Sequence, residues 1–384
     1  IALSVMLLVV AGLFIRSLVN VARVDLGLNT DDVVTFRISP ARNGYDSLET
    51  RALFERTEEA MRAIPGVTQV SAAMVPVLGG SSWGTDVAVQ GWESGPDIDS
   101  NARFNWVGPG FLSVLEMPLL AGREFTDADA AGQPPVAIVN EAFTRKFNLD
   151  GADAVGKFMS TNSGAEPGEL DREIVGVVRD AKYNDVKEAV PPLFFLPWRQ
   201  VQGSIPGLTF YLRTGVEPSV VMGQVPQAMK AVDPNLPVES LKTLQQEVDD
   251  RVVVDRFIST LAVAFALLAT LLAAVGLYGV LAYTVALRTR EIGVRVALGA
   301  DRGQVQGMVV RQVGRLAVVG GVIGLAASFF LGRGAESLLF ELKGWDPLVM
   351  AGVIVVLGLV CLIAAYAPAL RASRVDPMTA LRWE

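Results

Sequence analysis

The chain has 384 residues, of which 51% are hydrophobic and 19% are charged, with a formal net charge of −7 and a mean hydropathy of +0.40. Soluble domains carry roughly 25% charged residues, so the lower fraction predicts membrane segments. The sequence has no histidine and a single cysteine, Cys361, which excludes Ser-His-Asp and Cys-His triads, zinc sites built on these residues and an internal disulfide.

Four apolar stretches predict membrane-spanning helices, because a span needs about 20 apolar residues to cross ~30 Å of hydrocarbon. They are residues 1–15, 257–287, 316–331 and 347–370. The first stretch is short and the chain begins inside it, so we expect a truncated first helix, with a secretory signal peptide as the alternative. The other three lie together in the last third of the chain, which disfavours buried helices of a soluble protein.

The charges of the connecting segments predict the topology. The loop 288–315 carries six arginines against Glu291 and Asp301, and the tail after Leu370 carries three arginines against two acids. By the positive-inside rule both segments are cytoplasmic. Residues 16–256 are then extracytoplasmic, and their 22 basic and 33 acidic side chains give a net charge of −11. An acidic outer domain repels phosphates, which excludes nucleic acid as a partner.

The outer segment alternates short apolar strands with amphipathic helices, so we expect an α+β domain. Strands are predicted at residues 33–38, 86–90, 135–139, 173–178 and 208–212. A helix is predicted over residues 47–64, and a second over residues 217–232, kinked or shortened at Pro226. Residues 240–256 are predicted to be helical and to continue into the second span without a break.

Three patterns in the outer domain imitate binding sites. Residues 151–157 (GADAVGK) have the spacing of a phosphate-binding loop, but Phe158 stands where Ser or Thr would hold magnesium. The paired acids of residues 97–99 and 127–129 could contribute to a calcium site, although solvated carboxylates are the simpler interpretation. Four aromatic side chains could line a ligand surface or fill a core: Trp83, Trp92, Trp106 and Phe111. We predict no catalytic residue, metal or cofactor.

Glycines in the spans predict close helix packing. Gly276 and Gly279 lie in the second span, and Gly320 and Gly324 form a GxxxG pair in the third. The three complete spans carry no charged residue, whereas intramembrane charges are typical of ion or polar pathways. This pattern favours transmission of conformational change over conduction of a solute.

The segment 288–300 (RTREIGVRVALGA) predicts a short amphipathic helix at the membrane surface. Glu291 and Arg295 are in the favourable acid-first i,i+4 order, and Gly299 suits a helix end. Two interpretations are open. The arginines contact lipid phosphates, or the helix is a rigid knob that docks into a cytoplasmic partner.

These residues resemble a known family. The RTREIGVRVALGA segment, the tail RASRVDPMTALR and the three spans around them resemble the C-terminal domain of FtsX-like ABC transporter permeases. The segments RFNWVGPGFLSVLEMPLLAGREFTDAD, PVAIVNEAFTRKF and REIVGVVRDAKYND resemble the periplasmic domain of MacB-type permeases. The resemblance covers nearly the whole chain.

The resemblance implies a membrane α-helical fold of four transmembrane helices, the first truncated, with a large α+β extracytoplasmic domain of two subdomains. The implied divisions are a first helix and stalk at 1–28, a MacB-like periplasmic domain at 29–245, and an FtsX-like permease domain at 246–384. Within the periplasmic domain, a porter-like subdomain comprises about 30–90 and 205–245, and a sabre-like subdomain about 91–204. The start of the chain is similar to the second half of tandem-duplicated permeases.

In this family two permease units pair, and a cytoplasmic ABC ATPase engages the loop between the second and third helices. The implied coupling segment consists of Arg288, Thr289, Arg290, Glu291, Ile292, Gly293, Arg295, Ala297, Gly299 and Ala300. Implied partners are that ATPase, a second permease unit (a homodimer partner or a tandem half) and membrane lipid. A periplasmic adaptor is a further candidate. The implied location is a bacterial inner membrane, with multiple passes.

The predicted function is therefore that of a permease subunit, not an enzyme, which couples ATP hydrolysis on a separate ATPase to export or extraction of a substrate. The alternative is a membrane-anchored sensor or binding protein without transport activity. A membrane enzyme is a third interpretation, but the spans lack the carboxylates or lysines that it would need.

Overall fold

The computed structural model divides the chain into two compact units, each described by itself. The helical unit comprises Ile1–Arg23 and Val252–Glu384, and the sheet unit comprises Val24–Arg251. The structure describes residues 1–93, 95, 97–161, 170–201, 203–288, 294, 302–336 and 339–372.

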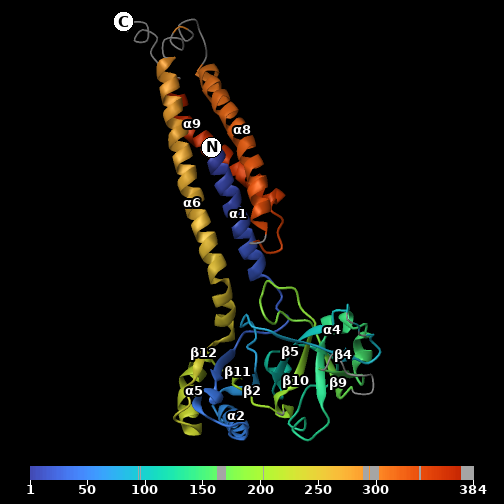
Figure 1. The fold of residues 1–384 in the computed structure, drawn as a ribbon. Coiled ribbons are helices and arrows are strands. Elements are labelled where there is room, and N and C mark those ends of the chain that lie inside the picture. Colours follow the sequence, from blue (N-terminus) through green and yellow to red (C-terminus); the bar gives the residue numbers. More distant parts are fainter. Residues whose placement is uncertain are drawn as a thin grey trace. The chain divides into compact units, whose positions relative to one another are not determined.

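Twelve strands of the sheet unit form one sheet (Figure 1). Their order is β12-β1-β11-β2-β5-β10-β7-β9-β8-β4, with β3 paired to β5 and β6 paired to β9. The strands are β1 (Val33–Ile38), β2 (Val67–Ala73), β3 (Trp83–Asp86), β4 (Ala88–Val89), β5 (Asn101–Val107), β6 (Leu119–Gly122), β7 (Val136–Asn140), β8 (Phe158–Ser160), β9 (Arg172–Val178), β10 (Leu193–Pro197), β11 (Leu208–Thr214) and β12 (Glu239–Thr243).

The strands β12, β1, β11 and β2 form a ferredoxin-like half with the helices α2 (Ser47–Arg62) and α5 (Pro218–Val232). Its chain order is βαβ followed by βαβ, and all its strand pairs are antiparallel. Phe36 on β1 stacks on Phe210 of β11 at 5.2 Å between ring centroids. Both helices cover this apolar face, because their buried residues join the same core. α2 begins with a capping box in which Asp46 and Glu49 exchange hydrogen bonds with each other's backbone N–H.

The other strands form an inserted half, which enters the chain between β2 and β11. Here β5, β10, β7 and β9 are mixed in direction, and α4 (Glu141–Lys146) packs beside them. A second core contains Phe143, Phe147 and Phe194, all fully buried. The two halves meet where β2 pairs with β5 at one register position, Ala73 opposite Val107. The sheet is therefore continuous but narrow at its middle.

Most predicted strands and helices of this unit are confirmed. The strand predicted at 33–38 matches β1, and the predicted helices correspond to α2 and α5, the latter containing Pro226 without being shortened. The strand predicted at 86–90 is wrong as a single element, because the chain changes partner there. β3 ends on β5 and β4 pairs with β8.

A second correction concerns the start of the stalk helix. Residues 240–243 belong to β12, and the helix α6 begins at Leu244. The reason is local. The Thr243 hydroxyl accepts a hydrogen bond from the Gln246 N–H at 3.1 Å, and the Gln246 side chain accepts one from the Thr243 N–H at 3.0 Å. This reciprocal cap fixes the boundary.

Among its described residues, the helical unit contains four helices that are long and apolar enough to cross a membrane. They are α1 (Ala2–Ala22), α6 (Leu244–Leu287), α8 (Arg302–Gly334) and α9 (Pro347–Ala372). α6 is unbroken over 44 residues, as the sequence predicted from Leu244 onward. α1 extends past the predicted end at Ile15, and buried residues such as Val5 and Val9 pack into the core of this unit. This packing disfavours the signal-peptide alternative.

Candidate functional site

The predicted coupling segment follows the end of α6. Arg288 is described, and its N–H donates hydrogen bonds to the carbonyls of Thr284 and Val285. The other predicted coupling residues lie outside the described residues: Thr289, Arg290, Glu291, Ile292, Gly293, Arg295, Ala297, Gly299 and Ala300. Within this segment Val294 is described, and its side chain is exposed. The coupling role of the segment stays a prediction.

The first turns of α6 are tied to a loop of the sheet unit, residues 74–80, which we name the junction loop. Arg251 Nε donates to the carbonyl of Leu78 at 2.8 Å, and its Nη2 lies 3.2 Å from Glu247. Glu247 also pairs with Lys242 on β12 at 2.6 Å. Gly80 has φ +70°, and a Cβ there would lie 2.4 Å from the Arg251 guanidinium. The positive φ favours glycine at this position, because other residues rarely adopt this backbone conformation.

The junction loop also contacts both halves of the sheet unit. The Asn105 amide on β5 donates to the Val75 carbonyl at 2.8 Å and accepts from the Val75 N–H at 2.9 Å. The Tyr211 hydroxyl on β11 accepts from the Val77 N–H at 2.8 Å. Burial raises the pKa of Tyr211, so its hydroxyl stays neutral. One loop thus joins the inserted half, the ferredoxin-like half and the base of α6.

In the helical unit, α1 contacts each of the other three helices. Ser4 donates a hydrogen bond to the Ala269 carbonyl of α6 at 2.8 Å, and Ser259 donates to the Phe14 carbonyl of α1 at 3.3 Å. A Cβ at Gly12 would lie 2.7 Å from Val349 of α9. α1 is therefore held by small residues and by interhelical hydrogen bonds, as is common in membrane helices.

The four glycines predicted to pack helices fall into two classes. A Cβ at Gly324 would lie 2.7 Å from the Ala2 carbonyl oxygen, and one at Gly320 would lie 2.6 Å from Ile1. The GxxxG pair of α8 therefore lies directly against α1. A Cβ at Gly276 or Gly279 of α6 would have no atom of the described chain within 4 Å. The surface around these two glycines is open in this single chain.

A polar contact that the sequence did not indicate lies at the end of α1. Arg16 forms an ion pair with Asp346, the residue before α9. Asp346 also accepts hydrogen bonds from the N–H groups of Leu348 and Val349 and so caps that helix. The next residue of α1, Ser17, accepts a hydrogen bond from the Phe340 N–H at 2.9 Å. The loop between α8 and α9 is thereby fixed to α1.

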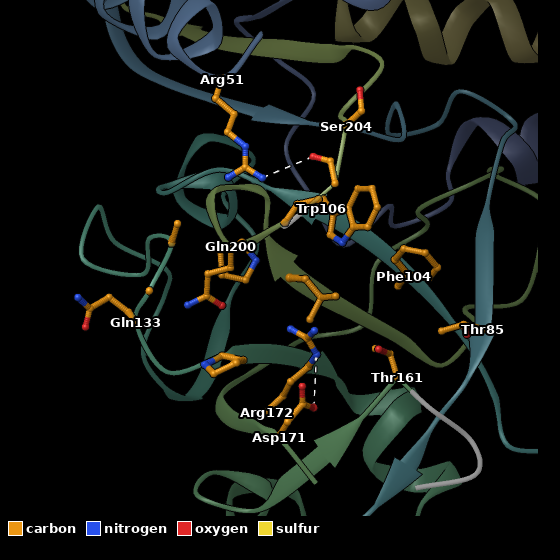
Figure 2. Close-up of a pocket in the computed structure, with 17 residues that line it drawn as sticks. Arg51, Thr85, Phe104, Trp106, Gln133, Thr161, Asp171, Arg172, Gln200 and Ser204 are labelled. Carbon is orange, nitrogen blue, oxygen red and sulfur yellow. Dashed lines mark hydrogen bonds and ion pairs between the residues drawn. The ribbon is translucent and has the colours of Figure 1, made fainter. Parts of the chain in front are cut away.

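A cleft of ≈ 810 Å³ lies between the two halves of the sheet unit. Its lining comes from α2, β3, β5, β9, β10 and the segment after the short helix η4 (Trp198–Gln200). Figure 2 shows Trp106 and Phe104 along one wall, with the Arg51 and Arg172 guanidinium groups directed into the cleft from different sides. The edge of Trp83 packs on the Trp106 ring at 5.9 Å.

The two cleft arginines are poorly neutralised. Arg172 Nε lies 3.8 Å from Asp171, which is longer than a hydrogen bond, and this buried nitrogen has no hydrogen-bond partner among the described residues. Arg51 reaches the carbonyls of Arg199 and Gly203 only at 3.5 Å. The cleft therefore offers cationic groups beside an aromatic wall.

A buried ion pair beside the cleft joins its two sides. Glu58 of α2 is 1% exposed and accepts a hydrogen bond from Arg199 at 2.6 Å, while Arg62 lies 3.6 Å away. Arg199 also pairs with Asp127 of the inserted half at 2.5 Å. Burial raises the pKa of the Glu58 carboxyl, and Arg199 and Arg62 oppose this effect.

The other patterns noted in the sequence have structural roles. Residues 151–154 form a short 3₁₀ helix that leads into β8. Three of the paired acids have basic partners: Lys146 for Asp99, Arg199 for Asp127 and Arg123 for Asp129. Of the four aromatic residues, Trp92 packs on Phe147 and Phe111 on Tyr211, whereas Trp106 lines the cleft and Trp83 packs against Trp106.

No sequence motif marks the junction loop or the cleft arginines. Arg51 lies on the outside of a predicted helix, and Arg172 immediately precedes a predicted strand. They share one cleft because α2 and β9 belong to different halves that the continuous sheet joins. Because Arg51 and Arg172 are far apart in the sequence, no local pattern could predict that they line the same cleft.

The fold is that of a multi-pass membrane protein with a large α+β domain between its first and second membrane helices. Residues 1–232 match the family described as MacB-like periplasmic core domain, and residues 263–377 match the FtsX-like permease C-terminal family. The chain therefore belongs to the MacB-like family of membrane proteins and carries an FtsX-like permease domain.

Two relatives and one solved structure are similar to this chain. A Bacillus subtilis protein named "Uncharacterized ABC transporter permease YknZ" is 24% identical over 74% of this chain and 71% of its own length. A Pseudomonas entomophila protein named "Probable export ATP-binding/permease protein MacB" is 24% identical over 74% of this chain. The match covers 43% of that relative. The periplasmic region of MacB from Actinobacillus actinomycetemcomitans matches at a TM-score of 0.37, with 14% identity over 57% of this chain and 92% of that structure.

Proposed function

We propose that this chain is the permease subunit of an ABC transporter. In this proposal, a separate cytoplasmic ATPase hydrolyses ATP, and the chain converts that event into a conformational change of its extracytoplasmic sheet unit. The work done is export or extraction of a substrate. Family membership supports the permease role, and the relatives' names support export.

The continuity of α6 is the observation that carries the coupling mechanism. At ~1.5 Å per residue its 44 residues are about 66 Å long, roughly twice the ~30 Å thickness of the hydrocarbon. Its first turns are held by the junction loop through Arg251, and its last turn leads to the predicted coupling segment at Arg288. A rigid element of this length can transmit a displacement from one side of the membrane to the other.

The open surface around Gly276 and Gly279 supports a second proposed partner, another permease unit. Small residues allow close helix approach, and nothing in the described chain occupies this surface of α6. The second unit is either another copy of this chain or a homologous half of a longer polypeptide. Lipid is the other occupant of this surface.

The test introduces flexibility into α6 without changing the contacts between Arg251 and the junction loop. Val253 and Val254 are exposed and follow Arg251. We expect Val253→Gly combined with Val254→Gly to leave ATPase binding intact and to abolish the ATP-dependent change in protease protection of the sheet unit. The matched control, Ala at both positions, keeps the helix rigid because alanine favours helix by about 1 kcal/mol per residue over glycine. Equal coupling in both variants would exclude α6 as the transmitting element.

A second experiment tests the ATPase contact. Glu291→Lys reverses the charge in the proposed coupling segment, and Glu341→Lys makes the same change in the loop between α8 and α9. We expect only Glu291→Lys to reduce the recovery of a cytoplasmic ABC ATPase with the purified chain. If no ATPase is recovered with the unaltered protein under ATP-trapping conditions, the membrane-anchored sensor becomes the better interpretation.

A further inference from the structure

We propose that the cleft between the two halves of the sheet unit binds a small amphiphile that has one anionic headgroup and an aromatic or acyl body. The cleft volume of ≈ 810 Å³ lies within the roughly 300–1,000 Å³ range of small-molecule sites. This inference depends on the cleft alone, so it goes beyond the proposed coupling to an ATPase and does not require it.

Arg172 is the group that would hold the headgroup. Its buried Nε has no hydrogen-bond partner among the described residues, and Asp171 is 3.8 Å away. The Arg172 side chain is 22% exposed, and its guanidinium group is directed into the cleft (Figure 2), so an anion that enters the cleft can pair with the exposed part of this group. The planar guanidinium matches the paired oxygens of a carboxylate or a phosphate. Both headgroups share this chemistry, and the experiment below separates them.

The aromatic wall would hold the body of the ligand. Phe104 and Trp106 are half-buried and line the cleft, and Leu196 extends the apolar surface. Phe104 and Trp106 are held in place by edge contacts with each other at 5.8 Å and with Trp83. A rigid aromatic surface binds flat aromatic groups and acyl chains at little cost in conformational entropy.

The charge of the cleft differs from that of its surroundings. Residues 16–256 carry a net charge of −11, whereas the charged side chains among the described residues that line the cleft are Arg51, Arg172 and Asp171. A local excess of positive charge in an acidic domain attracts an anion and disfavours a cationic ligand. Arg51, with only long contacts to backbone carbonyls, can contribute a second donor as the ligand enters.

The experiment measures binding of three probes to the full chain in lipid nanodiscs by equilibrium dialysis. The probes are 2-naphthylacetate, 2-naphthyl phosphate and the neutral 2-naphthylacetamide, and empty nanodiscs correct for partition into lipid. We expect at least one anion to bind about tenfold more tightly than the amide, as a charge-assisted pair would provide. The tighter of the two anions identifies the headgroup.

Variants locate the site. Arg172→Gln should reduce the preference for the anion to about twofold. Arg172→Lys should restore part of this preference, because lysine keeps the positive charge but cannot donate two parallel hydrogen bonds. Trp106→Leu should weaken the binding of the anions and of the amide equally. The matched control is Arg179→Gln, which changes an exposed arginine that pairs with Asp25 outside the cleft.

Two results would overturn the proposal. One is equal binding of the anions and the amide to the unaltered protein. The other is an anion affinity that Arg172→Gln lowers no more than Arg179→Gln does. Neither result depends on an ATPase, so failure here is distinguishable from failure of the coupling mechanism.

Discussion

The two units of this protein are stabilised in different ways. The largest fully buried side chains, among them Trp198, Tyr211 and Phe210, all belong to the sheet unit. In the helical unit, by contrast, close contacts involve small residues such as Gly324 and Ser4, and large apolar side chains are mostly exposed. Water drives apolar side chains inward in the first case. Lipid does not drive apolar side chains inward, so close backbone approach and interhelical hydrogen bonds stabilise the helical unit.

The same substitution in the two units gives the strongest test of this difference. Phe210→Ala removes a side chain with 0% exposure from the stack with Phe36, and we expect a loss of about 3–5 kcal/mol in the free energy of unfolding. Phe265→Ala removes a side chain of α6 that is 57% exposed, and its loss should stay below ~1 kcal/mol because lipid surrounds it before and after unfolding.

The measurement is chemical denaturation of the full chain in nanodiscs, followed by tryptophan fluorescence. The indole of Trp198 lies next to Phe54 and reports on the ferredoxin-like core, whereas Trp345, between α8 and α9, reports on the helical unit. Equal losses for Phe210→Ala and Phe265→Ala would show that the two units bury apolar groups by the same mechanism, contrary to the comparison.

The buried charge of the sheet unit gives the next largest effect. Arg199→Met leaves the Glu58 carboxylate buried with only Arg62 near, and we expect a loss of about 3 kcal/mol at pH 7. The pKa of Glu58 is already raised by burial, and loss of Arg199 raises it further. A raised folded pKa gives stability that is present at low pH and lost as pH rises through it.

The defect of Arg199→Met should therefore shrink as pH falls from 7 toward the ordinary Glu pKa of about 4.3, because protonation removes the unpaired charge. Denaturation curves at several pH values check this. Arg145→Met, which alters an exposed pair with Asp180, is the control. A defect that is independent of pH would mean that Arg199 acts through packing on Trp198 instead.

Glycine substitutions test the helical unit. Gly324→Ala places a methyl group against the Ala2 carbonyl and Val5, and overpacking of this kind costs about 1–3 kcal/mol. Gly276→Ala meets nothing in the described chain, so the higher helix propensity of alanine should leave stability unchanged or raise it by up to about 1 kcal/mol.

Thermal unfolding in nanodiscs separates the two glycine variants. If Gly276→Ala is as damaging as Gly324→Ala, another molecule packs on that surface of α6. Cross-linking between copies would then identify the second permease unit directly.

The smallest expected effect concerns the pair between the half-exposed Arg123 and the buried Asp129. The Asp129 carboxylate forms an ion pair with Arg123 and accepts two hydrogen bonds from its guanidinium, both at 2.8 Å. Burial alone would raise the pKa of the Asp129 carboxyl, but the hydrogen bonds from Arg123 and Thr126 outweigh it and hold the pKa below its ordinary value. Because Arg123 is half-exposed, solvent screening limits the loss in Asp129→Asn to about 1 kcal/mol at pH 7.

The pH dependence of this pair has the opposite sign to that of Glu58. A lowered folded pKa gives stability that is present above the ordinary Asp pKa of about 3.9 and is lost as pH falls through the folded value. The difference between the unaltered protein and Asp129→Asn should therefore disappear in acid. A difference that grows in acid would contradict the assigned direction.

Local sequence patterns were sufficient to predict most helices and strands, but not to predict which strands pair with one another. The alternation of apolar residues at 33–38 predicted β1 correctly, and the unbroken helix beyond Leu244 was also predicted. The strand at 86–90 was predicted as one element because its composition is uniform, while the switch from β5 to β8 depends on neighbours far along the chain. The division into porter-like and sabre-like subdomains stays a prediction.

The sequence by itself determined the membrane helices, the acidic α+β domain between the first two and the family resemblance. These features depend on hydrophobic length, charge and short motifs, which are properties of contiguous residues. Only the tertiary structure decided that Gly320 and Gly324 lie on α1, that Arg251 holds the junction loop, and that Arg51 and Arg172 share a cleft. These contacts join residues distant in sequence, and packing, not local propensity, determines which distant residues meet.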